Sequence, residues 1–272
     1  MRLLPHANSR SLRAWTAVAG GLLPLLASAV LTTPYAHAED ALIEGPRWVI
    51  IDNGREISIN GRIYRAQCTT RHRTAILAQP DGQVVQFNVF PGDEWAGDHA
   101  LAERAELSGH PDPLANDAEF WLSFAVVVEY ESESEGLDAY LGQLHQSPGE
   151  NDASAEPPFL LHLQGRKLDV EIRASAENPL TADPGPTILY TDEEFVWGEW
   201  VYFVFHINLD PTDGFVRAWR DGESIIDFNG GVGFASTEGV YWKFGSYRNE
   251  IPDGYYGTRF AHVEVSLDNL SH

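Results

Sequence analysis

The chain has 272 residues, of which 43% are hydrophobic and 11% aromatic, and this is enough apolar material for one sizeable core. The formal net charge of −22 argues against nucleic acid as a ligand, because a phosphate backbone needs a cationic surface. The only cysteine is Cys68, which excludes an internal disulfide and metal sites built from several cysteines.

The first 38 residues have the pattern of a secretory signal peptide. Three arginines precede the apolar run WTAVAGGLLPLLASAVL, and the small-residue triplet AHA ends the segment at Ala38. A retained membrane anchor is the alternative, but two glycines and Pro24 interrupt the run, which is short for a membrane span. We therefore expect cleavage after Ala38, export to the periplasm or the medium, and a mature domain over 39–272 without a membrane partner.

Short apolar segments separated by turn residues follow along the rest of the chain. In order, they cover 47–54, 56–61 with 62–67, 75–79 with 83–90, 160–175, 200–230 and 258–270. Their length and their Gly, Pro, Asp and Asn punctuation predict strands joined in hairpins. The stretch DHALAERAELS (98–108) has some helical periodicity, and a loop that runs into a strand is the alternative. Residues 146–158 and 175–186 are predicted to be long loops.

These segments predict one all-β domain built from antiparallel strands. At this length, two packed sheets, as in a jelly roll, are the expected arrangement. A jelly roll has one concave sheet, which can hold an extended, chain-like ligand.

The stretch YWKFGSYRN (241–249) contains one of only two lysines in the chain. Side chains on a strand point alternately to opposite faces. One face would therefore carry Tyr241, Lys243, Gly245, Tyr247 and Asn249, and the other Trp242, Phe244, Ser246 and Arg248. The second face fits a core, while the first is polar, with Gly245 clearing space at its middle. An ordinary solvated outer strand is the alternative.

Two further stretches place functional groups at strand spacing. In LGQLHQ (141–146), Gln143 and His145 share a face and offer an amide and a group that titrates near neutrality. In ERAELSG (103–109), Arg104 and Glu106 share a face, and an arginine held by a glutamate suits recognition of a carboxylate. A surface pair and a structural ion pair are the respective alternatives.

Taken together, Arg-x-Glu-Leu, Gln-x-His and Tyr-x-Lys-x-Gly-x-Tyr in this order resemble the β-jelly-roll polysaccharide lyases. From about residue 85 to the end, FPGDEWAGDHALAERAELSG, GEWVYFVFHINLDPTDGFVRAWRDGE and VYWKFGSYRN are similar to the heparin-lyase-I and glucuronan-lyase type. Jelly-roll alginate lyases carry similar strands, although Leu144 replaces their usual Ile or Val. The resemblance implies a concanavalin A-like sandwich and a lyase that cleaves a glucuronan-like or alginate-like polyuronate by β-elimination.

The resemblance also implies roles for single residues. Arg104 and Gln143 would hold and neutralise the substrate carboxylate. Tyr247 would remove the C5 proton, protonate O4 or do both, and His145 would act as a base or as a further neutralising group. Lys243 is expected to lower the pKa of Tyr247. His99 is a second candidate for the catalytic histidine. The expected substrate-binding set is Lys243, His99, Glu106, Asn249, Arg248 and Tyr241.

Two other functions fit an all-β sandwich. A retaining glycoside hydrolase would need two carboxylates about 5–5.5 Å apart, and neither DEEFVWGEW nor DVEIRAS has the spacing typical of that class. A lectin-like binding module would use aromatic platforms such as Trp95, Trp219 and Trp242. We expect an anionic polysaccharide as the partner and a monomer that requires no cofactor. A structural calcium loop at Asp210, Asp213 and Gly214 is the alternative to a plain turn.

Overall fold

A computed structural model describes residues 48–69, 73–79, 82–98, 102–130, 136–249 and 254–268. Over these ranges the chain forms eighteen β-strands and no helix. None of the described residues therefore builds a helix with the length and apolar character that a membrane crossing needs. The predicted signal peptide, residues 1–38, lies outside the described residues.

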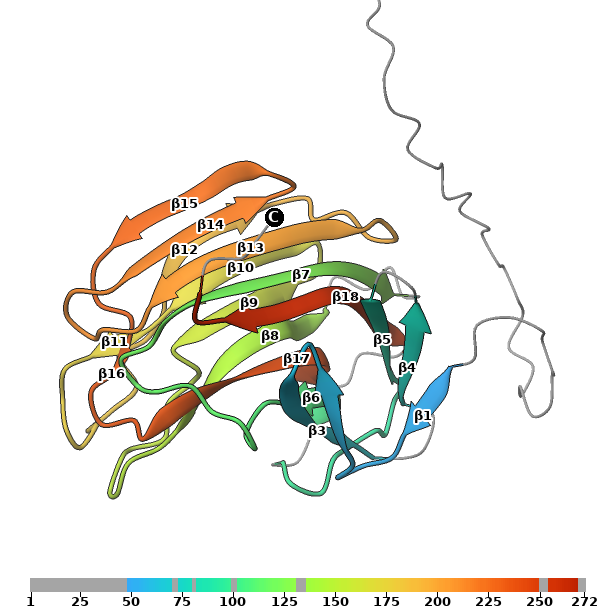
Figure 1. The fold of residues 1–272 in the computed structure, drawn as a ribbon, viewed down its shortest axis with the longest axis horizontal. Coiled ribbons are helices and arrows are strands. Elements are labelled where there is room, and N and C mark those ends of the chain that lie inside the picture. Colours follow the sequence, from blue (N-terminus) through green and yellow to red (C-terminus); the bar gives the residue numbers. More distant parts are fainter. Residues whose placement is uncertain are drawn as a thin grey trace, which may run out of the picture. The chain divides into compact units, whose positions relative to one another are not determined.

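Sixteen of the strands form two eight-stranded sheets, which we call the first and the second sheet (Figure 1). The first sheet runs in the order β1 (Val49–Ile51), β4 (Thr74–Gln79), β5 (Gly82–Val89), β18 (Tyr256–Ser266), β7 (Glu119–Tyr130), β13 (Val201–Asn208), β14 (Phe215–Arg220) and β15 (Glu223–Asn229). The second sheet runs in the order β12 (Thr187–Asp192), β10 (Lys167–Ile172), β9 (Phe159–Gln164), β8 (Asp138–Ser147), β17 (Gly239–Asn249), β6 (Ala102–Ser108), β3 (Arg62–Cys68) and β2 (Glu56–Ile59). A short parallel pair joins β11 (Ala174–Ser175) to β16 (Gly233–Phe234).

All neighbours within the two large sheets are antiparallel, so the predicted all-β jelly-roll sandwich is confirmed. The predicted hairpins are present as β2–β3, β4–β5, β9–β10 and β13–β14–β15. In the stretch 98–108, the strand alternative is correct over Ala102–Ser108, and the helical one is wrong there. All seven residues of β6 are buried, because the strand lies in the interior of its sheet and is covered on both faces.

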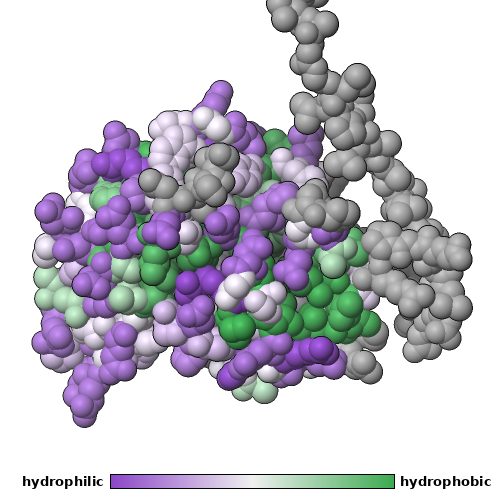
Figure 2. Space-filling model, in the orientation of Figure 1, coloured by the Kyte–Doolittle hydropathy of each residue, from purple (hydrophilic) through white to green (hydrophobic). Residues whose placement is uncertain are grey.

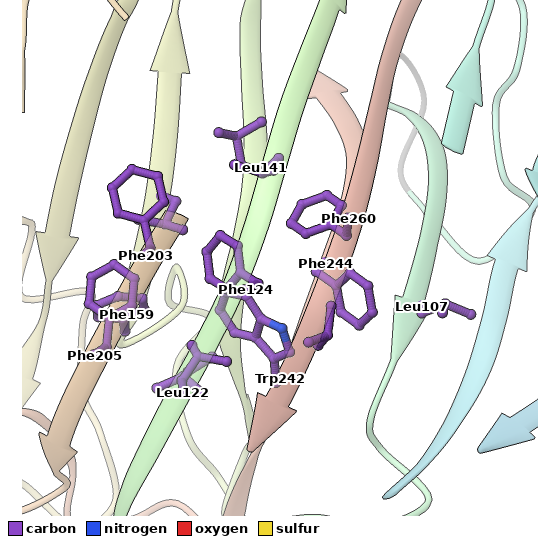
Figure 3. Packing of buried hydrophobic residues seen from close by; sticks show 14 of the residues in the cluster. Leu107, Leu122, Phe124, Leu141, Phe159, Phe203, Phe205, Trp242, Phe244 and Phe260 are labelled. Atoms are coloured by element: carbon purple, nitrogen blue, oxygen red, sulfur yellow. The ribbon is translucent and has the colours of Figure 1, made fainter. Parts of the chain in front are cut away.

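Aromatic side chains from the two sheets meet in the core (Figure 3). Phe124 of β7 stacks on Trp242 of β17 with ring centroids 5.6 Å apart, and Phe260 of β18 contacts Phe244 of β17 at 5.1 Å. These contacts join strands of opposite sheets, so burial of the inward residues of β17 holds the sandwich together. From outside, hydrophilic residues make up most of the rim and hydrophobic residues gather across the middle of the view (Figure 2).

The sheet order brings three sequence-distant strands together. β17 lies between β8 and β6 in the second sheet, although the three strands are far apart along the chain. Tyr247 pairs with Arg104 on one side and with Tyr140 on the other, and Lys243 pairs with Gln143. Side chains that point away from the core on these strands therefore share one surface, which we call the outer face of the second sheet.

Candidate active site

The outer face of the second sheet collects most of the predicted site residues. Trp242 and Phe244 are buried in the core, as strand alternation predicts, and Tyr241 and Lys243 point the other way. The contacts described below join Tyr241, Lys243 and Tyr247 of β17 to Arg104 and Glu106 of β6 and to His145 of β8, and Gln143 of β8 to Glu106. The three motifs thus form one cluster.

Arg104 lies at the centre of this cluster. Its Nη2 is 2.8 Å from Asp98 Oδ1, its Nε is 3.1 Å from Glu106 Oε2, and its Nη1 donates to Gln67 Oε1 at 3.0 Å. The guanidinium also lies 4.6 Å from the ring centre of Tyr247 and 5.3 Å from that of Trp95. Two aromatic rings and three polar partners therefore fix the plane of this cation.

Glu106 is completely buried and has three partners of its own. Besides Arg104, Lys243 Nζ lies 3.3 Å from its Oε2, and Gln143 Nε2 donates to its Oε1 at 3.2 Å. Burial alone would raise the pKa of Glu106, but the two cations and the amide outweigh it and hold the pKa below its usual range. The carboxylate therefore orders Lys243, Arg104 and Gln143 on one surface.

Tyr247 lies between the ring of Tyr140 and the guanidinium of Arg104. Its ring stacks on Tyr140 with centroids 5.2 Å apart, and Arg104 covers it. Burial raises the pKa of Tyr247 to about 12, even though Arg104 pulls it down. We expected Lys243 to lower this pKa. The structure instead places Arg104 on the tyrosine ring, while Lys243 is paired with Glu106.

His145 is held in one tautomer by its neighbours. Its Nδ1 lies 2.9 Å from the carbonyl oxygen of Gln146 and 3.1 Å from the hydroxyl oxygen of Tyr241. A carbonyl only accepts, so Nδ1 carries the proton and Nε2 keeps its lone pair. Burial, followed by the nearby charge of Lys243, lowers the pKa of His145 to about 4. The imidazole is therefore neutral at physiological pH.

A second network adjoins the tyrosine pair. The ring of Tyr140 contacts His162 edge to face, with centroids 5.0 Å apart. His162 Nδ1 lies 2.8 Å from Glu171 Oε1, and its Nε2 lies 2.5 Å from Asp138 Oδ1. Burial would lower the pKa of His162, but the two carboxylates raise it to about 9. An imidazolium therefore supports the ring on which Tyr247 stacks.

The remaining predicted residues have different positions. Asn249 lies on the outer face and donates to Tyr140 Oη at 3.2 Å. Arg248 points the other way: it is 0% exposed, and its Nε donates to Glu103 Oε2 at 2.5 Å, so it has no access to a ligand on the outer face. His99 lies outside the described residues.

The predicted role of Gly245 is also corrected. A Cβ at this position would lie 2.5 Å from the Ala105 carbonyl oxygen and 3.1 Å from the ring of Phe87. Its φ of +144° is also one that other residues rarely adopt. Glycine is therefore required by the close approach of β6, and not to clear space for a ligand.

No group of three or more His, Cys, Asp or Glu side chains in the described ranges could hold a metal ion. At the candidate calcium loop, Asp210 Oδ1 accepts hydrogen bonds from the backbone N–H groups of Thr212 and Asp213. These bonds are those of a turn capped by an aspartate. Of the three tryptophans considered for a lectin-like platform, Trp242 is in the core and Trp219 stacks on Trp121 of the first sheet.

Sequence reasoning missed several members of the cluster, namely Gln67, Asp98, His110, Tyr140 and His162. His110 contacts the ring of Tyr241 edge to face, with centroids 5.1 Å apart. Asp98 could have been predicted from the sequence, because it belongs to the same stretch as Arg104. Tyr140 could not be found in this way. Alternation from Gln143 and His145 would place Tyr140 on the core side of the strand, but a β-bulge at Leu141 turns it to the outer face.

Comparisons with known proteins identify the family and the fold of the chain. Residues 56–265 match a family model described as polysaccharide lyase. An endo-beta-1,4-glucuronan lyase from the fungus Trichoderma reesei has a similar structure, with 12% identity, 85% of this chain and 91% of that chain covered, and a TM-score of 0.53. Alginate lyase A1-II′, a member of polysaccharide lyase family 7, gives 15% identity, 76% and 95% coverage, and a TM-score of 0.53. No curated protein sequence matches the chain.

Proposed function

The chain belongs to the polysaccharide lyase family, and on that premise we propose that it cleaves a polymer of uronic acid by β-elimination at the outer face of the second sheet. The similar solved structures are named as lyases of glucuronan and of alginate, which are both polyuronates. Their names support the substrate class. A polyanionic substrate also agrees with Arg104 and Lys243, two cations that lie on the outer face within a strongly acidic chain.

β-Elimination makes three chemical demands. The proton on C5 of the uronate must be removed, the charge that develops on the adjoining carboxyl group must be stabilised, and the departing O4 must receive a proton. The electrons of the C5–H bond form the C4=C5 double bond as the C4–O4 bond breaks. This reaction needs no nucleophile and no redox cofactor.

The proposal rests on two groups that lie on the same face: a phenol that keeps its proton at neutral pH and an imidazole that is neutral there. Tyr247, with a pKa of about 12, holds its phenolic proton at neutral pH and can give it to O4. His145, with a pKa of about 4 and its Nδ1 proton directed at the Gln146 carbonyl, has a lone pair on Nε2 that can take the C5 proton. We therefore assign His145 as the base and Tyr247 as the acid.

Gln143 and Arg104 are assigned to the substrate carboxyl group. The amide of Gln143 and the guanidinium of Arg104 are both fixed by Glu106, so they need no rearrangement as charge develops. Removing one such preorganised donor costs about 2.7–4 kcal/mol of transition-state stabilisation. On the pattern of residues 1–38, we further propose that the enzyme works outside the cytoplasm.

The first test is the Tyr247→Phe variant. It keeps the ring that packs against Tyr140 and Arg104 and removes only the proton donor. We expect loss of the ultraviolet absorbance of the unsaturated product, by a factor of at least about 100, with unchanged folding by circular dichroism. His145→Ala should lose activity as well, whereas Tyr202→Phe on the first sheet should keep it. A fully active, folded Tyr247→Phe enzyme would refute the assignment.

A panel of polyglucuronate, alginate and heparin-type chains identifies the substrate in the same assay. New reducing ends without the ultraviolet signal would indicate hydrolysis, and binding without either signal would indicate a lectin. On the best substrate, Arg104→Ala should raise KM and lower kcat together, because the guanidinium contacts the carboxylate in both the ground state and the transition state. A rise in KM alone would restrict Arg104 to uniform binding.

A further inference from the structure

Arg104 already has protein partners before any substrate arrives. Each of its three nitrogen atoms has a partner within the protein, on Asp98, Glu106 and Gln67. Two of these partners are carboxylates, the same chemical group that a uronate would bring. A substrate carboxylate that approaches the guanidinium at Nη2 would therefore meet Asp98 there.

The two carboxylates on Arg104 differ in burial and in their place in the fold. Glu106 is 0% exposed, lies within β6, and is bound by Lys243 and Gln143 as well as by Arg104. Removing it would leave a buried cation and a buried amide without their partner, which is costly. Asp98 comes from the segment 91–98 that follows β5, and its side chain is 10% exposed. Glu106 is therefore the permanent partner, and Asp98 is the replaceable one.

Asp98 also occupies one of the nitrogen atoms through which Arg104 could bind a substrate carboxylate. Its Oδ1 lies 2.8 Å from Nη2 of the same guanidinium that covers the ring of Tyr247 at 4.6 Å. A uronate carboxylate bound at this nitrogen would lie beside Tyr247, the proposed donor to O4. The indole of Trp95, from the same segment as Asp98, lies near the guanidinium at 5.3 Å.

We propose that Asp98 is an internal stand-in for the substrate carboxylate, paired with Arg104 in the free enzyme and displaced when a uronate binds. This inference rests on the proposed function. The charges balance in both states: in the free enzyme, Arg104 and Lys243 match Asp98 and Glu106, and in the complex the uronate takes the place of Asp98. A neutral sugar brings no charge to replace the aspartate, so the exchange selects for acidic sugars.

The test replaces Asp98 by asparagine, which keeps the size of the side chain and removes its charge. The Asp98→Asn change is made in the inactive Tyr247→Phe background, and a uronate tetrasaccharide is titrated by calorimetry. Loss of the competing carboxylate should tighten binding by about tenfold, within the usual range for a coupled site. In the otherwise native enzyme, KM should fall by a similar factor while kcat changes little. A neutral glucose tetrasaccharide should show no such gain.

Asp192→Asn is the matched control, because it removes an aspartate from another part-buried pair, with Arg220. It should leave the affinity for the uronate unchanged. Weaker binding and a lower kcat in folded Asp98→Asn would show that Asp98 positions Arg104, and would overturn the inference. Asp98→Ala, checked by thermal unfolding, provides a second variant if the first does not fold. Failure of the proposed function is distinct, since the native protein would then cleave no uronate.

Discussion

Burial shifts the pKa values of the two proton-transfer residues in opposite directions. The same partly covered surface raises the pKa of the Tyr247 phenol to about 12 and lowers the pKa of the His145 imidazole to about 4, because in each case it disfavours the charged form. The acid thus keeps its proton and the base stays ready to accept one. Lys243 follows the same rule: burial lowers its pKa to about 8, although Glu106 opposes the change.

These values predict the pH dependence of the reaction. Activity should be lost as pH falls through about 4, where His145 becomes protonated, and as pH rises through about 8, where Lys243 loses the charge that holds Glu106. The measurement is kcat/KM against pH on the best polyuronate. In Lys243→Arg the cation stays charged, so the upper limb should move to higher pH. If the upper limb stays at the same pH in that variant, the upper limb reports the titration of another group.

At the scale of the strands, two bulges shape the site. The β8–β9 register shifts at Leu141, and the β8–β17 register shifts between Phe244 and Tyr247. The first shift turns both Leu141 and Gly142 toward the core, so that Tyr140 can point outward and stack on Tyr247. Gly142 is needed there, because a Cβ would lie 2.2 Å from the buried indole of Trp242.

Gly142→Ala should therefore destabilise the protein. The indole is rigid and packed against Phe124, so the extra methyl group forces a rearrangement of the core that costs about 1–3 kcal/mol. The free energy of unfolding from urea titration measures this loss. Gly136→Ala is the matched control, because nothing lies within 4 Å of its Cβ position. Equal stability of the two variants would contradict the described packing at the bulge.

At the scale of the whole molecule, a neutral site lies within an acidic chain. The formal net charge is −22, whereas Arg104 and Lys243 are matched one for one by Asp98 and Glu106. A polyuronate must therefore approach against long-range repulsion and is attracted only at short range. The ion pairs of the site are largely buried and are screened little by salt, while the surface charges are screened strongly.

Moderate salt should consequently speed the reaction on a polymer. Raising NaCl from about 10 mM to about 150 mM shortens the screening length from about 30 Å to about 8 Å. We expect kcat/KM on the polyuronate to rise over this range, and to rise less on a short oligouronate that carries fewer charges. A steady fall with salt would show instead that local attraction dominates the approach of the substrate.

The sequence determined the features that depend on neighbours along the chain. Hairpin turns and apolar alternation predicted the strands. Side-chain alternation along β17 correctly placed Trp242 and Phe244 on one face and Tyr241, Lys243 and Tyr247 on the other. The resemblance carried by three short motifs indicated the family and the residues that meet on one face. These signals are local, because the direction of a side chain on a regular strand is set by its immediate backbone.

The tertiary structure alone decided which groups act on one another. Arg104 rather than Lys243 covers Tyr247, Arg248 is buried against Glu103, and Tyr140 reaches the outer face only through a bulge. Strand order, register shifts and burial fix these relations, and they arise from packing between residues that are far apart in the chain. The pKa values and the Asp98 contact depend on that packing, so no local pattern could have specified them.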